Sequence, residues 1–123
     1  MIIVNRIEEH EKHKASLLSK IDVLKDIPGT LIMPGVWSDW DLGSEIVREY
    51  LDEFYDLIDP IMEGVAKSLG FLTPEYLIRD YQMGITKIWF NQYSEGGEHD
   101  WHNHPGCQFT NCYYLELPNA EYS

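Results

Sequence analysis

The chain has 123 residues, one domain's worth of sequence, and 44% of them are hydrophobic. Its formal net charge of −12, from 21 acidic and 9 basic residues, argues against nucleic acid as a partner. No segment has the ~20 consecutive apolar residues of a membrane span, and the polar N-terminal region argues against a signal peptide. We therefore expect a cytoplasmic protein whose charge serves solubility or attracts a cationic peptide or protein substrate.

The first part of the chain is expected to be helical after a short β-prone run at residues 2–7. Between residues 8 and 24, apolar side chains recur at helical spacing among charged ones, which predicts an amphipathic helix. Two histidines of this helix, His10 and His13, lie among Glu and Lys and are expected to be solvated.

A second helix is expected after a loop region. Glycines and prolines predict loop around residues 26–35, and the aromatic and acidic stretch 37–42 predicts a packed loop. Asp41 or Ser44 is the expected N-cap of the helix that follows. Its apolar stripe continues to residue 69, and Pro60 is expected to kink the helix or divide it in two.

The last part of the chain is expected to be rich in strands. Residues 76–78, 84–93 and 107–117 are β-prone, and the second of these runs has the strongest strand composition. Because helices come first and strands later, we predict an α+β fold. We expect one domain over residues 1–123, mainly helical in residues 1–75 and β in residues 76–123.

A histidine cluster precedes the last predicted strand. His102 and His104 are two residues apart, so on an extended strand both project from one face and can chelate one divalent metal ion. Glu98 and Asp100 share that parity and are candidate ligands or hydrogen-bond partners of the imidazoles, whereas His99 faces the other way. The competing interpretation is a polar surface loop that binds no metal.

Four short motifs lie in one order around this cluster. They are Trp-Phe-Asn-Gln-Tyr at residues 89–93, a glycine loop at Gly97, His-Asn-His-Pro-Gly at 102–106, and Tyr-Tyr-Leu at 113–115 with Pro118. Together they resemble a family of iron(II)- and 2-oxoglutarate-dependent oxygenases, prolyl-hydroxylase-like proteins of bacteria and tailed phages. The resemblance reaches back to Ser38 but is specific mainly from Trp89 onwards.

The resemblance implies a double-stranded β-helix, a jelly-roll or cupin-like fold, in which iron(II) and the cosubstrate 2-oxoglutarate support hydroxylation of a small-molecule or peptide substrate. Carried over to this chain, His102 is the first iron ligand, and Trp89, Asn91 and Tyr114 line the cosubstrate or substrate pocket. A place in the apolar core is the alternative for Trp89 and Tyr114. His104 stands where most such oxygenases have Asp or Glu, so the resemblance implies either an all-nitrogen site or an iron site without this ligand.

We expect the chain to carry only the N-terminal part of such a dioxygenase. Residues 84–123 have room for about three to five strands, whereas a jelly roll has about eight. No histidine follows His104 and no arginine follows Arg79, so the late iron ligand and the 2-oxoglutarate-binding arginine have no candidates. A fragment of a longer protein, a chain that pairs with a partner or with a copy of itself across an open sheet edge, and a degenerate member kept for binding remain the alternatives. The last of these is a non-catalytic metal- or protein-binding module, perhaps encoded by a phage.

Overall fold

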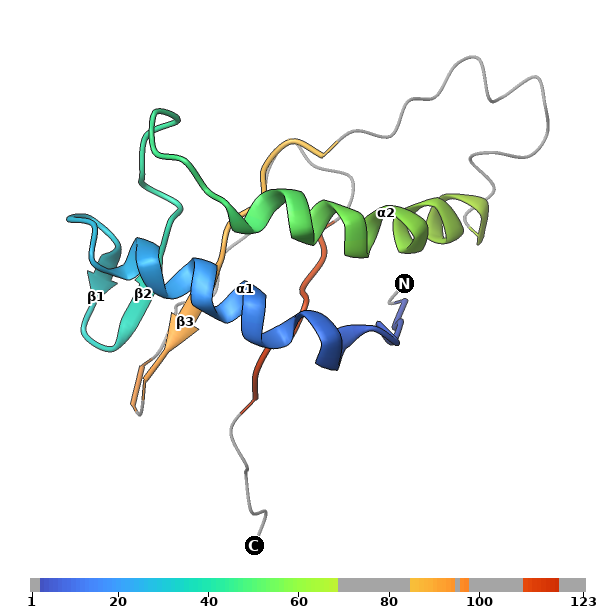
Figure 1. Ribbon diagram of the computed structural model, residues 1–123, viewed down its shortest axis with the longest axis horizontal. Helices are drawn as coiled ribbons and strands as arrows, with labels where there is room; N and C mark the ends of the chain where they lie inside the picture. Colours follow the sequence, from blue (N-terminus) through green and yellow to red (C-terminus); the bar gives the residue numbers. More distant parts are fainter. Residues whose placement is uncertain (1–2, 69–84, 95, 98–109, 118–123) are drawn as a thin grey trace, which may run out of the picture.

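The computed structural model describes residues 3–68, 85–94, 96–97 and 110–117. These residues form two helices and a three-stranded antiparallel sheet, so the predicted α+β class is confirmed (Figure 1). The elements in chain order are α1 (His10–Lys25), β1 (Leu31–Met33), β2 (Val36–Ser38), α2 (Tyr50–Ser68) and β3 (Asn91–Tyr93).

Helix α1 forms where the apolar periodicity predicts it. Leu17, Ile21 and Leu24 are buried on one side of the helix, as their helical spacing requires. The Thr30 hydroxyl lies 2.9 Å from the carbonyl oxygens of both Leu24 and Ile27, so it caps the end of the helix. Residues 3–7, within the β-prone run, form no strand.

Helix α2 begins later than the sequence indicates. Neither Asp41 nor Ser44 is its N-cap, because the helix starts at Tyr50. Arg48 donates to backbone carbonyl oxygens in residues 39–46, which holds this segment in a loop. Of the two effects expected of Pro60, a kink or a division of the helix, the division does not occur, since α2 continues through Pro60 to Ser68.

Strands β1 and β2 form a hairpin that we predicted as loop. Gly35 adopts a positive φ of 76° at the turn, a conformation that glycine tolerates best. Strand β2 also pairs with β3, with Trp37 opposite Gln92. The partner strand lies more than fifty positions further along the chain, and three residues on each strand are too few to give a clear alternating pattern.

The predicted strand at residues 84–93 is observed only in its last part. Residues 85–90 lie outside the sheet, and the strand is limited to β3. Likewise, the described part of the predicted strand at 107–117, residues 110–117, forms no strand. The β-prone run at residues 76–78 lies outside the described residues.

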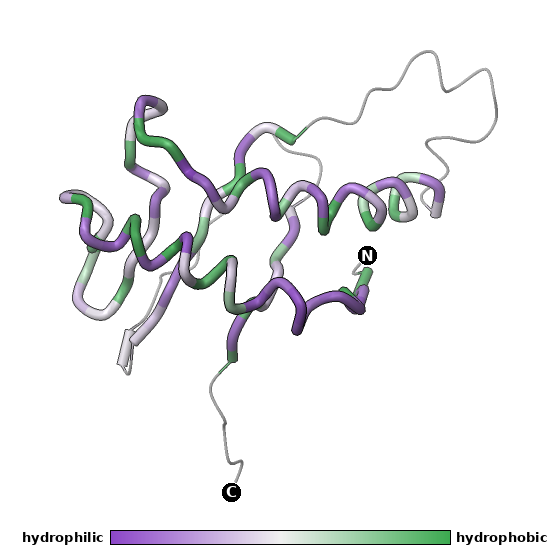
Figure 2. The backbone as a smooth tube through the Cα atoms, viewed as in Figure 1, coloured by the Kyte–Doolittle hydropathy of each residue, from purple (hydrophilic) through white to green (hydrophobic). Residues whose placement is uncertain are grey.

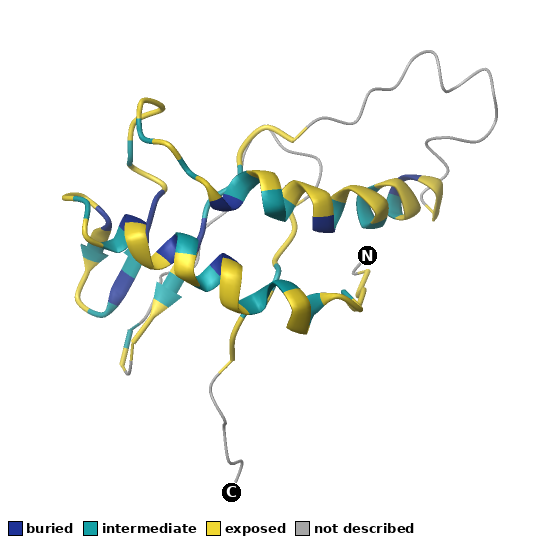
Figure 3. Cartoon of the chain, in the orientation of Figure 1, coloured by how far each residue is buried: buried dark blue, intermediate teal, exposed yellow. Residues whose placement is uncertain are grey.

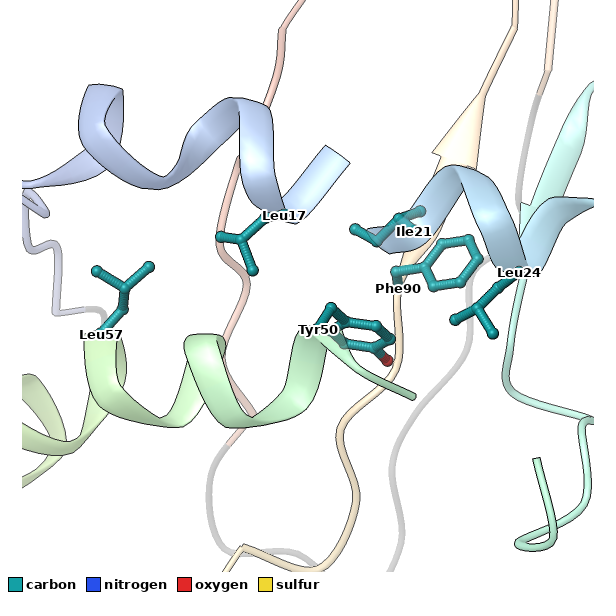
Figure 4. Packing of buried hydrophobic residues seen from close by; sticks show 6 residues of the cluster. All are labelled: Leu17, Ile21, Leu24, Tyr50, Leu57 and Phe90. Carbon is teal, nitrogen blue, oxygen red and sulfur yellow. The ribbon is translucent and has the colours of Figure 1, made fainter. Parts of the chain in front are cut away.

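The apolar core lies between α1, α2 and the segment that leads into β3. Helices α1 and α2 run side by side in opposite directions (Figure 1). The buried positions of α1 and those in the first half of α2 lie on the sides of the helices that face each other (Figure 3). Figure 4 shows the six core side chains, which are Leu17, Ile21, Leu24, Tyr50, Leu57 and Phe90.

Residues 110–117 cross the two helices (Figure 1), and Tyr113 and Leu115 of this segment pack against the core. The ring of Tyr113 stacks on Phe54, with 5.8 Å between centroids, and meets His10 edge-on at 5.7 Å. Polar and apolar residues alternate along both helices (Figure 2). Neither helix in the described ranges has the length and apolar character required to cross a membrane.

Candidate functional site

A buried carboxylate organises the region around the predicted pocket residues. Asp39 directly follows β2 and is only 1% exposed. Its Oδ2 accepts hydrogen bonds from Arg48 Nε at 2.9 Å and from the Tyr50 hydroxyl at 2.6 Å. Its Oδ1 accepts one from the backbone N–H of Phe90 at 2.9 Å. Asp39 therefore ties the loop before α2 to the segment before β3.

Arg48 compensates the charge of Asp39 and closes the same loop. The side chain is 13% exposed, and its remaining N–H groups point at backbone oxygens. The carbonyl acceptors belong to Asp39, Leu42, Gly43 and Ile46. Burial and the hydrogen bond to Asp39 raise the pKa of Tyr50, so its hydroxyl remains a neutral donor.

This anchoring fixes where Trp89 and Asn91 lie. Phe90, which lies between Trp89 and Asn91 in the sequence, is buried in the core. Trp89 is half-buried and meets the ring of Trp40 at 4.4 Å between centroids and an interplanar angle of 78°. Asn91 is exposed in β3, opposite Ser38 of β2.

Tyr114, the third predicted pocket residue, lies on the separate segment 110–117. It is 65% exposed, whereas its neighbour Tyr113 packs against the helices. The nearby Cys112 thiol, itself exposed, raises the pKa of Tyr114. The structure thus places Trp89 just before β3 and Asn91 at the start of β3. Tyr114 lies on another segment, with its side chain largely in solvent. This exposure is contrary to the alternative that Tyr114 belongs to the core.

The predicted metal ligands His102 and His104 lie outside the described residues, as do Glu98, His99 and Asp100. Within the described ranges, no group of three or more His, Cys, Asp or Glu side chains is arranged to hold a metal ion.

A cleft of about 290 Å³ lies beside the Asp39–Arg48 pair. Its walls combine polar groups with apolar side chains, and the lining residues are Asp39, Leu42, Ser44, Arg48, Leu51, Lys87 and Ile88. A larger hollow, of about 560 Å³, is lined by residues of α1 and the Asp26 that follows it. It is open along the helix surface, so the smaller cleft, with walls from two segments, is the better candidate for a ligand.

A second polar cluster joins α1 to α2 and corrects our expectation for two histidines. His13 Nδ1 lies 2.6 Å from Glu53 Oε2, while Ser16 and Lys20 donate to Glu53 Oε1 at 2.6 and 3.0 Å. His10 Nδ1 contacts the Tyr113 hydroxyl. Both histidines are therefore half-buried and bonded, not solvated, because their partners come from distant parts of the chain.

These contacts change the acidity of Glu53. Desolvation raises its pKa, but hydrogen bonds from Ser16, His13 and Lys20 and the charge of Lys20 together lower the pKa from 4.5 to about 2. The cluster therefore links α1 to α2 through the Glu53 carboxylate.

The sequence analysis did not single out Asp39, Arg48 or Tyr50. One signal was available: Arg48 is the only basic residue between residues 39 and 56, a stretch with seven acidic residues. A lone arginine in such a stretch is a candidate for a buried ion pair. We found no match to this chain among protein-family models, curated proteins or solved structures.

Proposed function

We propose that the chain forms the N-terminal part of an iron(II)- and 2-oxoglutarate-dependent oxygenase that hydroxylates a small-molecule or peptide substrate. The observation that carries the proposal is the sequence His102-Asn-His104-Pro, placed between the Trp89–Tyr93 motif and Tyr113-Tyr-Leu in the order of that family. Two neutral imidazoles two residues apart are a donor set that suits iron(II). A jelly-roll fold is part of the same proposal.

The glycine loop after β3 gives physical support to the motif. A Cβ atom on Gly97 would lie 2.5 Å from the carbonyl oxygen of Gly35, which is too close for any side chain. The Ser94 N–H donates to that same oxygen at 2.8 Å. A glycine at position 97 therefore lets the chain pass against the β1–β2 turn immediately before the histidine segment.

In this proposal His102 and His104 hold the iron, and Trp89, Asn91 and Tyr114 line the cosubstrate or substrate pocket. Iron(II) with 2-oxoglutarate would supply dioxygen activation for hydroxylation of a C–H bond. The residues of the chain would bind and orient the reactants. The exposed Asn91 amide offers both donors and an acceptor, and the Tyr114 hydroxyl is a donor at neutral pH.

Metal titration of matched histidine variants tests the ligand assignment. We expect His102→Ala to abolish binding of iron(II), or of cobalt(II) as its spectroscopic substitute, measured by anaerobic calorimetry and visible absorption. His99→Ala is the control, because the opposite parity of His99 predicts unchanged binding. Unchanged metal affinity in His102→Ala would overturn the assignment.

A non-catalytic metal- or protein-binding module is the second candidate. It is favoured by His104, which stands where most such oxygenases have an Asp or Glu ligand. Conversion of 2-oxoglutarate to succinate distinguishes the two functions when it is assayed in a protein that also supplies the late histidine and the arginine, since a module would bind metal there without this conversion. Strand β1, which pairs only with β2 among the described strands, offers an edge for self-association, and light scattering measures the oligomeric state.

A further inference from the structure

Trp40 presents an aromatic surface beside the cleft at Asp39. Its side chain is 40% exposed, although it also packs against Trp89. Trp89 in turn precedes Phe90, whose N–H is bound by the buried Asp39 carboxylate. The position of the Trp40 ring is thus supported from the core, while a large part of it is accessible to solvent.

The ammonium group of Lys87 occupies this aromatic surface. Lys87 Nζ lies 3.6 Å from the centroid of a Trp40 ring and donates a hydrogen bond to the Trp40 carbonyl oxygen at 2.9 Å. Both contacts are to uncharged groups, and within the part of the chain that the structure describes Lys87 makes no ion pair. Exposed cation–π contacts of this kind are weak, so the ammonium group is exchangeable.

The surroundings favour positive charge. Asp41, Glu45 and Glu49 are exposed on the segment that follows Trp40, and the whole chain carries a net charge of −12. Such a field attracts cationic partners and repels anionic ones. The cleft that Lys87 lines also has apolar walls, from Leu42, Leu51 and Ile88, which suit the methylene stem of a lysine.

We propose that Trp40 and the adjoining cleft bind a primary ammonium group, the side chain of a lysine in a basic peptide, and that Lys87 occupies this position in the free chain. The carbonyl oxygen of Trp40 selects a primary ammonium, because a quaternary one has no N–H to donate. The site goes beyond the proposed oxygenase function and needs no metal, so either proposal can fail without the other.

Nuclear magnetic resonance of the indole N–H groups tests this site in the full chain without iron. The chain has four tryptophans, whose indole signals can be followed separately. The probe is the peptide acetyl-Gly-Gly-Lys-Gly-Gly-amide, compared with versions that carry norleucine or trimethyl-lysine in place of lysine. We expect the lysine peptide to shift the Trp40 signal with a millimolar dissociation constant. The trimethyl-lysine peptide should bind more weakly, and the norleucine peptide most weakly.

Variants separate this site from unspecific attraction by the acidic chain. Lys87→Met removes the internal competitor and should tighten peptide binding about two- to fivefold, the value of one exposed cation–π contact. Trp40→Leu should abolish binding of the lysine peptide. Lys25→Met is the matched control, because Lys25 lies over Trp37 at 4.5 Å in a second lysine–tryptophan pair, and peptide affinity should not change.

Three results would each overturn the proposal. The first is a Trp40 signal that does not respond to millimolar lysine peptide. The second is equal binding of the norleucine peptide, and the third is weaker binding by a folded Lys87→Met chain.

Discussion

The substitution Asp39→Asn tests whether the buried carboxylate holds the two parts of the fold together. The new amide can keep its oxygen towards the Phe90 N–H, as Oδ1 has it now. Its NH₂ group then replaces Oδ2 and faces the N–H of Arg48 Nε, donor against donor. Tyr50 can turn its hydroxyl to accept from the amide, but Arg48 has no acceptor to offer.

The cost follows from the burial of the pair. The Asp39 side chain is 0% exposed and that of Arg48 is 13% exposed. Breaking a buried ion pair on one side costs about 3–5 kcal/mol. Because backbone carbonyls still accept from Arg48, we expect the lower end, about 3 kcal/mol, and a decrease in Tm on the order of 10 °C.

Urea unfolding followed by circular dichroism measures this free energy, and hydrogen exchange of the Phe90 amide reports the local contact. The control is Asp41→Asn, an exposed carboxylate two positions away, which should change the free energy of unfolding by no more than about 0.5 kcal/mol. If Asp39→Asn costs no more than Asp41→Asn, the carboxylate does not anchor the segment before β3 and our account of the region is wrong.

Two further predictions concern the helices. The pKa of Glu53 is lowered to about 2, so its contacts stabilise the fold above pH 4.5 and this contribution is lost as pH falls from 4.5 to about 2. Glu53→Gln should therefore cost about 1 kcal/mol at pH 7, allowing for solvent screening, and only a small part of this at pH 2, where Glu53 is about half protonated. The control is Asp56→Asn, an exposed carboxylate on the same helix, and a urea midpoint of Glu53→Gln equal to that of the control at pH 7 would contradict this. Pro60→Ala should stabilise α2 by about 1–3 kcal/mol in thermal unfolding because it restores an N–H inside the helix. The control is Gly64→Ala, for which we expect a stabilisation of about 1 kcal/mol, since the added Cβ meets nothing within 4 Å. The stabilisation by Pro60→Ala should be the larger of the two, and a smaller one would refute this reasoning.

The sequence by itself determined the features that depend on neighbours along the chain. The helical spacing of Leu17, Ile21 and Leu24 predicted both α1 and the side that it buries. The presence of both helix-prone and strand-prone segments predicted the α+β class, although two of the three strands, β1 and β2, precede α2. Each of these follows from the local repeat of the backbone, which is written in consecutive residues.

Only the tertiary structure decided which polar residues are buried and with what partners. Strand β2 of the hairpin also pairs with β3, far along the chain, and the half-buried His13 hydrogen-bonds to Glu53 of α2. Asp39 looks like any loop carboxylate until Arg48 and the Phe90 N–H meet it. A buried charge is tolerated only where such donors converge, and that convergence is a property of the fold, not of any segment.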